Sequence, residues 1–219
     1  PGIISVKNGA LYIIGYIDND TTIIDTLSST FTYSKTAFIS KFHFNLKLNW
    51  VRFITSTNWP TACDICTDSI SNNYICGIFR SDINFGTTNF TGSPGGDLFI
   101  AKYDSSGIVI WAKNFGGTMN DNVVTLRTGG ETDIFIAGNF QSSITFGTST
   151  LTSIGSDMYV ARLNSSGDAV WAVQSNVGGA SSVTCTGMDL GSGIIVCGSF
   201  NGMLTLGSKT YSSTWNGSD

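Results

Sequence analysis

The chain has 219 residues and few charges, with 11 Lys plus Arg against 15 Asp plus Glu, and its net charge at pH 7 is −4. Nucleic acids and anionic membranes are bound mainly through clustered Lys and Arg. No basic stripe is present, so neither is expected as a partner. The apolar runs are much shorter than the roughly 18 residues of a transmembrane helix, and no membrane span is predicted.

Short apolar segments recur along the chain between turns that are rich in Gly, Ser and Asn. In chain order they are 10–17, 36–53, 61–69, 73–79, 83–91, 97–117, 122–130, 133–140, 144–152, 157–174, 182–190, 193–200 and 204–212. The SSG sequences at 105–107 and 165–167 suit tight hairpin turns. Segments such as 133–140 are apolar at consecutive positions, which indicates sheets covered on both faces. The sequence predicts an all-β protein without helices.

Several of these segments return at a nearly constant spacing. Trp50, Trp111 and Trp171 are separated by 61 and 60 residues, and two glycine series keep the same period. The glycines are Gly15, Gly77, Gly138 and Gly198 in one series and Gly86, Gly147 and Gly207 in the other. Repeated units of four or more antiparallel strands are typical of the blades of a β-propeller. The predicted fold is therefore a β-propeller array of about 3.6 blades, since 219 residues hold 3.6 periods of ~61.

The predicted array is a single domain whose units are approximately 1–60, 61–121, 122–181 and 182–219. Pro1 falls inside the first strand of a unit, and Asp219 falls where Asp97 and Asp157 begin the repeated hairpin. Propellers close with about four to eight blades, and an open stack exposes apolar blade faces and strand edges. We expect the array to belong to a larger closed ring, either within a longer polypeptide or through another copy.

The regular part of the repeat resembles a known family. Its pattern is D-x-F-[IV]-A-[KR], then SSG, a strand with Trp, a turn with two glycines, I-A-G-N-F and T-F-G, and 97–174 keeps it best. This pattern is similar to the SBBP type of β-propeller repeat. The first unit departs from it, because Thr36 replaces the aspartate and STNWPT at 56–61 replaces the double-glycine turn. The resemblance implies a scaffold or interaction role in bacterial, archaeal or viral surface-associated proteins, and it supplies no catalytic residues.

We therefore expect a non-enzymatic structural or adhesive module that is extracellular, at a cell surface or at a virion surface. A rigid repeated core would present variable loops to protein partners, or to further blades of the same or another chain. Two alternatives stay open: a carbohydrate-binding, lectin-like propeller and an Asp-based glycoside-processing enzyme, which needs paired carboxylates. The single histidine, His43, lies at a predicted turn without a nucleophile motif and is not a catalytic candidate.

Candidate contact residues are those that differ between units, because residues that repeat in every unit, such as the three tryptophans, serve packing. Four non-repeated aromatic residues lie in predicted loop segments: Trp59, Trp215, Tyr33 and Phe31. Exposed aromatic rings hold sugars by stacking and anchor partner proteins. These four are the predicted ligand or partner contacts. The alternative is that they fill gaps where blades meet.

One acidic loop is a candidate metal site. Asp18, Asp20 and Asp25 have no counterparts in the later units, and their hard carboxylate oxygens suit Ca²⁺. The glycine and the final glutamate of an EF-hand are missing, so a solvated loop is the alternative. No other cofactor is expected.

The five cysteines do not form a disulfide framework. If residues 61–79 form a hairpin that turns near Asn72, Cys66 lies opposite Cys76, which would permit a cross-strand disulfide. The alternative is that these are free thiols that pack as small hydrophobic groups. Cys63 and Cys66 are not expected to bind zinc, because no second pair follows and residues three apart on a strand point to opposite faces.

Overall fold

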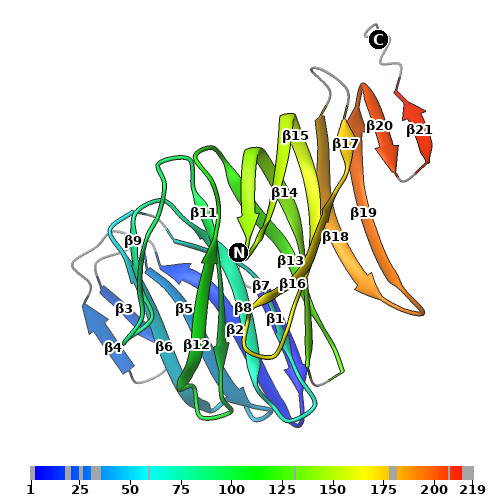
Figure 1. Ribbon diagram of the computed structural model, residues 1–219. Coiled ribbons are helices and arrows are strands. Elements are labelled where there is room, and N and C mark those ends of the chain that lie inside the picture. Colours follow the sequence, from blue (N-terminus) through cyan, green and yellow to red (C-terminus); the bar gives the residue numbers. More distant parts are fainter. Residues whose placement is uncertain are drawn as a thin grey trace, which may run out of the picture.

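The computed structural model describes residues 3–17, 21–24, 27–30, 36–58, 60–130, 132–177, 182–206 and 208–213 (Figure 1). Every regular element in these ranges is a β-strand, and apart from a single parallel bridge the strands pair antiparallel. The prediction of an all-β protein is therefore confirmed. Within the same ranges no helix is long and apolar enough to cross a membrane.

The strands are grouped here by the four predicted units. The first unit contains β1 (Ile3–Lys7), β2 (Ala10–Ile17), β3 (Thr21–Ile24), β4 (Leu27–Thr30), β5 (Thr36–His43) and β6 (Leu48–Ser56). The second contains β7 (Thr61–Thr67), β8 (Asn73–Phe79), β9 (Asp82–Asn84), β10 (Asn89–Thr91), β11 (Asp97–Tyr103) and β12 (Val109–Phe115). The third contains β13 (Asp121–Gly129), β14 (Asp133–Phe146), β15 (Ser149–Leu163), β16 (Ala169–Gln174) and β17 (Asn176–Val177). The fourth contains β18 (Ser182–Leu190), β19 (Ile194–Asn201), β20 (Met203–Leu206) and β21 (Lys209–Ser212).

Each of the first three units contributes four antiparallel strands to one sheet. Their orders are β1-β2-β5-β6, β7-β8-β11-β12 and β13-β14-β15-β16. A short hairpin is inserted between the second and third strands: β3–β4 in the first unit, β9–β10 in the second, and the distal ends of β14 and β15 in the third. The fourth unit begins in the same way, with β18 and β19 followed by the hairpin β20–β21. The sequence repeat thus corresponds to a repeated strand arrangement.

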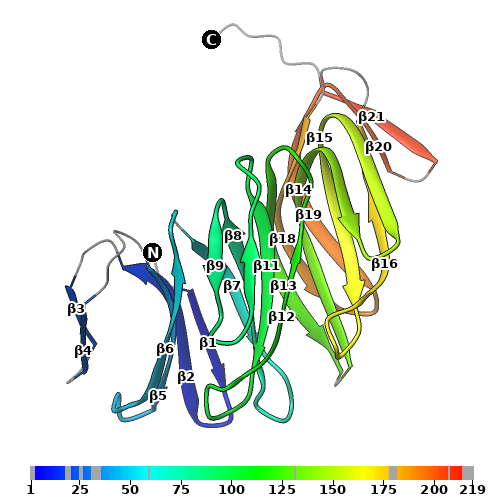
Figure 2. The same ribbon diagram turned by 60° about the vertical axis from the view of Figure 1, so that its left-hand side comes forward.

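The sheets stand face to face in chain order, as Figure 2 shows. Adjacent residues of β11 explain why its sequence is apolar at consecutive positions. Phe99 belongs to the core between the first and second sheets, and Ile100 belongs to the core between the second and third. Both side chains are fully buried. Burial of each such side chain stabilises the fold by about 1.5–3 kcal/mol, so the sheets are held mainly by the apolar layers between them.

A backbone contact also couples neighbouring units. In each case the inserted hairpin of one unit pairs with the end of the last strand of the unit before it. The pairs are Thr55 with Asn84, Gly116 with Thr145, and Asn176 with Thr205. Both members of the pair advance by 61 and then by 60 residues, so the register is the same at three successive junctions. We call this contact the junction pairing.

The hairpin of β7 and β8 differs from the prediction. The chain turns around Ile70, because the Asp68 carboxylate accepts backbone hydrogen bonds from Ile70 at 3.1 Å and from Asn72 at 2.8 Å. Cys66 consequently pairs with Tyr74, whereas Cys76 lies opposite Asp64. Both cysteines are free thiols, and in this register they do not face each other across the hairpin. Burial raises the pKa of the Cys66 thiol to about 12, which keeps it in the unreactive thiol form.

Candidate functional site

The predicted contact residues lie outside the part of the chain that the structure describes. They are Phe31, Tyr33, Trp59 and Trp215 for ligand or partner contact, and Asp18, Asp20 and Asp25 for Ca²⁺. Within the described part, no three His, Cys, Asp or Glu side chains gather in a way that would hold a metal ion. The candidate site among the described residues lies at a junction between units, where non-repeated residues meet.

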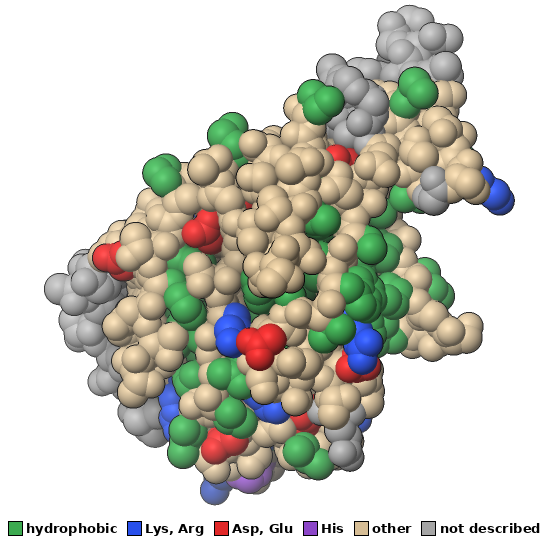
Figure 3. All heavy atoms as spheres, viewed as in Figure 1, with side chains coloured by type: hydrophobic (Ala, Val, Ile, Leu, Met, Phe, Trp, Pro, Cys, Tyr) green, Lys and Arg blue, Asp and Glu red, His purple; other side chains and the backbone are tan. Residues whose placement is uncertain are grey.

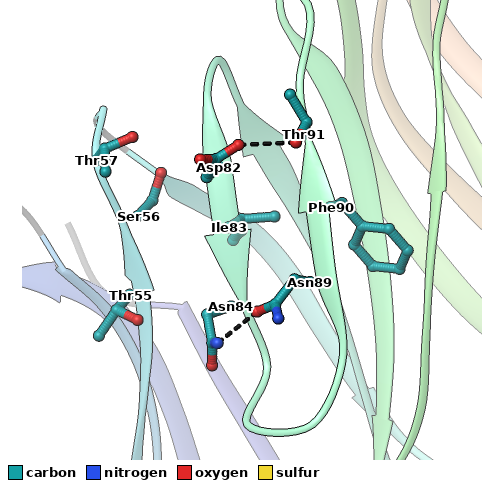
Figure 4. Close-up of a pocket in the computed structure, with 9 residues that line it drawn as sticks. All are labelled: Thr55, Ser56, Thr57, Asp82, Ile83, Asn84, Asn89, Phe90 and Thr91. Atoms are coloured by element: carbon teal, nitrogen blue, oxygen red, sulfur yellow. Dashed lines mark hydrogen bonds between the residues drawn. The ribbon is translucent and has the colours of Figure 1, made fainter.

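A hollow of about 450 Å³ lies at the first junction, between β6 and the hairpin β9–β10 (Figure 4). Nine residues line it: Thr55, Ser56, Thr57, Asp82, Ile83, Asn84, Asn89, Phe90 and Thr91. Thr55 and Asn84, which form the junction pairing, are both among these lining residues. The hollow thus exists because a hairpin of the second unit docks on the last strand of the first.

Local sequence explains the shape of the hairpin. Asn84 Oδ1 accepts the backbone N–H of Gly86 at 2.7 Å, and Phe85 N–H donates to the carbonyl oxygen of Thr88 at 2.9 Å. Gly86 has φ +85°, a left-handed conformation that glycine adopts without strain. Alternation along β9 buries Ile83 and leaves Asp82 exposed. One face of the hairpin therefore packs on the core and the other carries polar groups.

The polar groups of the hollow are already bonded to one another. Asp82 Oδ1 accepts a hydrogen bond from Thr91 Oγ1 at 2.8 Å, and Asn84 Nδ2 donates to Asn89 Oδ1. Phe90 belongs to the opposite face, where its ring packs against Phe85 at 6.2 Å. The hollow therefore offers hydroxyl, amide and carboxylate groups to a polar ligand, without an aromatic platform in its polar face.

The repeated tryptophans tie one unit to the next. Trp50 Nε1 donates to the carbonyl oxygen of Ser105 at 3.1 Å, and Trp111 Nε1 donates to that of Ser165 at 3.0 Å. Gly107 lies against the Trp50 indole, where a Cβ would come within 2.8 Å of the ring. The SSG turns of the second and third units thus accept a hydrogen bond from the tryptophan of the unit before them. This confirms that Trp50 and Trp111 serve packing.

Two carboxylates at the second junction show contrasting electrostatics. Three donors of the third unit bond to Asp64 Oδ2: Thr125 Oγ1 at 2.9 Å, the Leu126 N–H at 2.9 Å and Arg127 Nη1 at 2.7 Å. Asp121 is only 2 % exposed, and burial, with the nearby Asp97 carboxylate, raises its pKa to about 7.

Asp121 is nevertheless held as part of the backbone framework. Its Oδ2 accepts the N–H of Gly117 at 2.6 Å, and the backbone N–H of Gln141 also stabilises the carboxylate. Asp121 does not line the 450 Å³ hollow, and its neighbour Asp97 bonds to Ser93. A raised carboxyl pKa suits a general acid, but this carboxyl meets no surface that a glycoside could reach.

A sequence difference between the repeated hairpins points to residues of the hollow. The repeated hairpin reads INFGTTNFT in the second unit and ITFGTSTLT in the third. Asn84 and Asn89 stand where the third unit has Thr145 and Thr150, and only the second unit has this asparagine pair. The rule that sites are built from residues that differ between units would have selected Asn84 and Asn89.

The strand order, the stacked sheets and the junction pairing define a repeat protein built from antiparallel β-sheets. No family model matches the chain. An uncharacterized WD repeat-containing protein of Acanthamoeba polyphaga mimivirus is 25% identical over an alignment of 112 residues that covers 43% of this chain. The matched part is 8% of the length of that protein. The chain is thus distantly and partially similar to a viral WD repeat-containing protein.

Proposed function

We propose that this chain is a non-enzymatic structural or adhesive module that mediates protein–protein assembly at a cell or virion surface. The observation that carries the proposal is the junction pairing, which recurs in one register at three successive junctions. In a repeat array the same kind of contact joins each unit to the next one. Such an array can add a further repeat unit by the contacts that already join its own units.

The proposal includes a β-propeller arrangement of the SBBP type. Its support is the repeated order of four antiparallel strands, the face-to-face stacking of the sheets and the sequence pattern of 97–174. The surface location rests on the resemblance to surface-associated repeat proteins. The distant relative is a protein of a virus.

Self-association tests the proposal directly. Sedimentation velocity of the 219-residue chain over a range of concentrations should show reversible association through exposed sheet surface. Ile195 in β19 is 63% exposed, and Ile195→Asp should weaken the association, because a buried unpaired carboxylate is costly. Ile154 in β15 is 90% exposed, and Ile154→Asp is the matched control that should associate normally. A chain that stays monomeric at all concentrations, or an Ile195→Asp variant that associates unchanged, would argue against assembly.

A carbohydrate-binding role is the second candidate, and the hollow at the first junction favours it. Its exposed Asp82, Asn89 and Thr91 are the kinds of group that hydrogen-bond sugar hydroxyls. A glycan array separates the candidates: an assembly module gives no saturable sugar binding. Saturable binding that Asn89→Ala abolishes, with an unchanged melting temperature, would favour the lectin-like function. No observation favours a glycoside-processing enzyme, so we do not propose one.

A further inference from the structure

The second strand of each of the first three units carries a glycine that faces an aromatic ring on the third strand. The pairs are Gly15 with Phe38, Gly77 with Phe99, and Gly138 with Tyr159. A Cβ on Gly15 would come within 3.0 Å of the Phe38 ring, and one on Gly138 would come within 2.9 Å of the Tyr159 hydroxyl. The glycine therefore makes room for the ring. In the second and third units the ring, Phe99 or Tyr159, is part of the apolar core between neighbouring sheets.

Gly198 occupies the same position on β19 of the fourth unit. A Cβ there would collide with the carbonyl oxygen of Thr184, as one on Gly138 would with that of Asn122. The three atoms nearest to a Cβ on Gly198 lie within 3.4 Å and belong to Thr184 and Cys185, so among the described residues no aromatic ring comes closer than they do. In the described part of the chain β19 pairs only with β18. The place of the ring is a hollow of about 270 Å³. Its lining includes Met158, Val196, Gly198, Phe200, Leu204 and Tyr211.

Residues of β19 are more exposed than their counterparts in the earlier units. Ile194 is 37% exposed, whereas Ile134, its counterpart in β14, is 1% exposed. Cys197 is exposed, whereas its counterpart Cys76 in β8 is fully buried. Figure 3 shows hydrophobic side chains gathered on the side of the molecule where β18 and β19 lie. The described part of the fourth unit thus has an apolar sheet surface and a strand edge with no described partner.

The three occupied edges define the chemistry of the strand that fits. Starting opposite the glycine, the third strand reads Phe-Ile-Ser-Lys at 38–41, Phe-Ile-Ala-Lys at 99–102 and Tyr-Val-Ala-Arg at 159–162. The final cation covers an aromatic ring of the second strand in two units, with Lys102 Nζ 5.0 Å from the centre of the Tyr74 ring. In the fourth unit Ile195 takes the place of that ring.

We propose that the free edge of β19 is a docking site for a β-hairpin of another repeat unit. Its first strand reads aromatic, aliphatic, small, basic and pairs antiparallel with β19, and its aromatic ring fills the hollow on Gly198. This inference rests on the proposed assembly function and names the element that the partner supplies. Backbone hydrogen bonds give affinity in strand addition, and the side-chain pocket fixes the register.

A labelled peptide of residues 97–115, which is β11, its turn and β12, supplies the probe. Fluorescence anisotropy with the full chain should show saturable binding. Phe99→Ala in the peptide removes the ring and should weaken binding about tenfold or more, as loss of a buried aromatic anchor does. Ile110 is 51% exposed in β12, and Ile110→Ala in the peptide is the matched control that should bind as the parent peptide does.

Disulfide trapping tests the register, because the pairing of β8 with β11 places Ile100 opposite Cys76. The same register on β19 places Ile100 of the peptide opposite Cys197. In a glutathione redox buffer an Ile100→Cys peptide should form a disulfide with Cys197. An Ala101→Cys peptide should not, because its thiol points to the other face of the sheet. The Cys197→Ser chain is the blank for both peptides.

Three results would overturn the inference: absence of saturable binding, equal binding of the Phe99→Ala peptide, or equal trapping of both cysteine peptides. A chain that self-associates while the peptide neither binds nor displaces it would also overturn it, and would leave the assembly function standing. A monomeric chain that binds the peptide in the stated register would support the docking site while contradicting self-association.

Discussion

Asp121 is the residue whose ionisation the fold opposes. Burial is the largest cause that raises its pKa to about 7, followed among the raising effects by the Asp97 carboxylate. A group whose pKa is higher in the folded state stabilises the fold fully below its unfolded pKa. That stabilisation is lost as the pH rises through the folded value. The protein should therefore become less stable as the pH rises through about 7.

The substitution Asp121→Asn tests this pH dependence, because an amide of the same shape cannot ionise. The variant should lose less melting temperature than the parent as the pH rises through about 7. Asp168→Asn is the control: Asp168 is exposed and its pKa is lowered by Lys113, so this variant should retain the parental slope near neutral pH. Identical slopes for the parent and Asp121→Asn would show that Asp121 is already ionised in the folded protein.

Asp64, in contrast, should stabilise the fold, because its carboxylate accepts hydrogen bonds from the third unit. Asp64→Ala leaves Thr125, the Leu126 N–H and Arg127 without their acceptor at a largely buried site. We expect a loss of about 2–4 kcal/mol in the free energy of unfolding, measured by urea denaturation. Asp168→Ala breaks an exposed ion pair with Lys113, which solvent screens, and should leave the free energy of unfolding nearly unchanged. Equal losses would mean that the Asp64 cluster does not hold the junction.

At the scale of elements, the junction pairing is the feature that separates this array from loosely stacked sheets. At the second junction it depends on the turn at Gly116 and Gly117, because a Cβ on Gly117 would collide with the backbone carbonyl oxygen of Ser143. At the second junction the double glycine is thus required for this close contact. It lets the hairpin of the next unit approach the last strand of the unit before.

Gly117→Ala should therefore destabilise the chain by about 2 kcal/mol, since backbone must move to admit the methyl group. Gly193→Ala is the matched control, because a Cβ at Gly193 meets nothing within 4 Å, and this variant should be neutral or slightly more stable. The free energy of unfolding from urea denaturation gives both values. Similar stabilities for the two variants would mean that the close approach at Gly117 does not contribute.

The elements also show what the sequence could predict. The strands followed from local apolar patterns, and the tryptophan and glycine periods gave the repeat. The register of β7 and β8 did not follow, because the Asp68 side chain sets the turn. The pairing differs from the predicted one by two residues, a shift that keeps every side chain on the same face of the sheet. The junction pairing was missed because it joins backbones far apart in the sequence and leaves no side-chain signature.

The candidate site was predicted less well than the fold. The aromatic and acidic residues selected from the sequence lie outside the described residues, so those predictions are untested. The hollow at the first junction involves side chains of β6 that are distant in sequence from the hairpin β9–β10. Such proximity follows from stacking, which a single sequence with a repeat does not specify. The hollow on Gly198 is likewise recognised only when the structures of the four units are compared.

At the scale of the whole molecule, the array is asymmetric in what it leaves uncovered. The second and third sheets are covered on both faces, whereas β19 of the fourth unit exposes Ile195 and an unpaired edge. An edge of this kind readily accepts a strand from another chain. The proposed assembly function therefore predicts a contact at the fourth unit, where the repeated interface is incomplete within the described residues.

Amide hydrogen exchange of β19, measured on the dilute chain and again under associating conditions, tests assembly at this edge most directly. In the dilute chain the β19 amides should exchange faster than those of β8 and β14, whose edges are paired on both sides. On association the exchange of β19 should slow selectively. Protection of β19 equal to that of β8 in the dilute chain, or association without any change at β19, would contradict assembly through this edge.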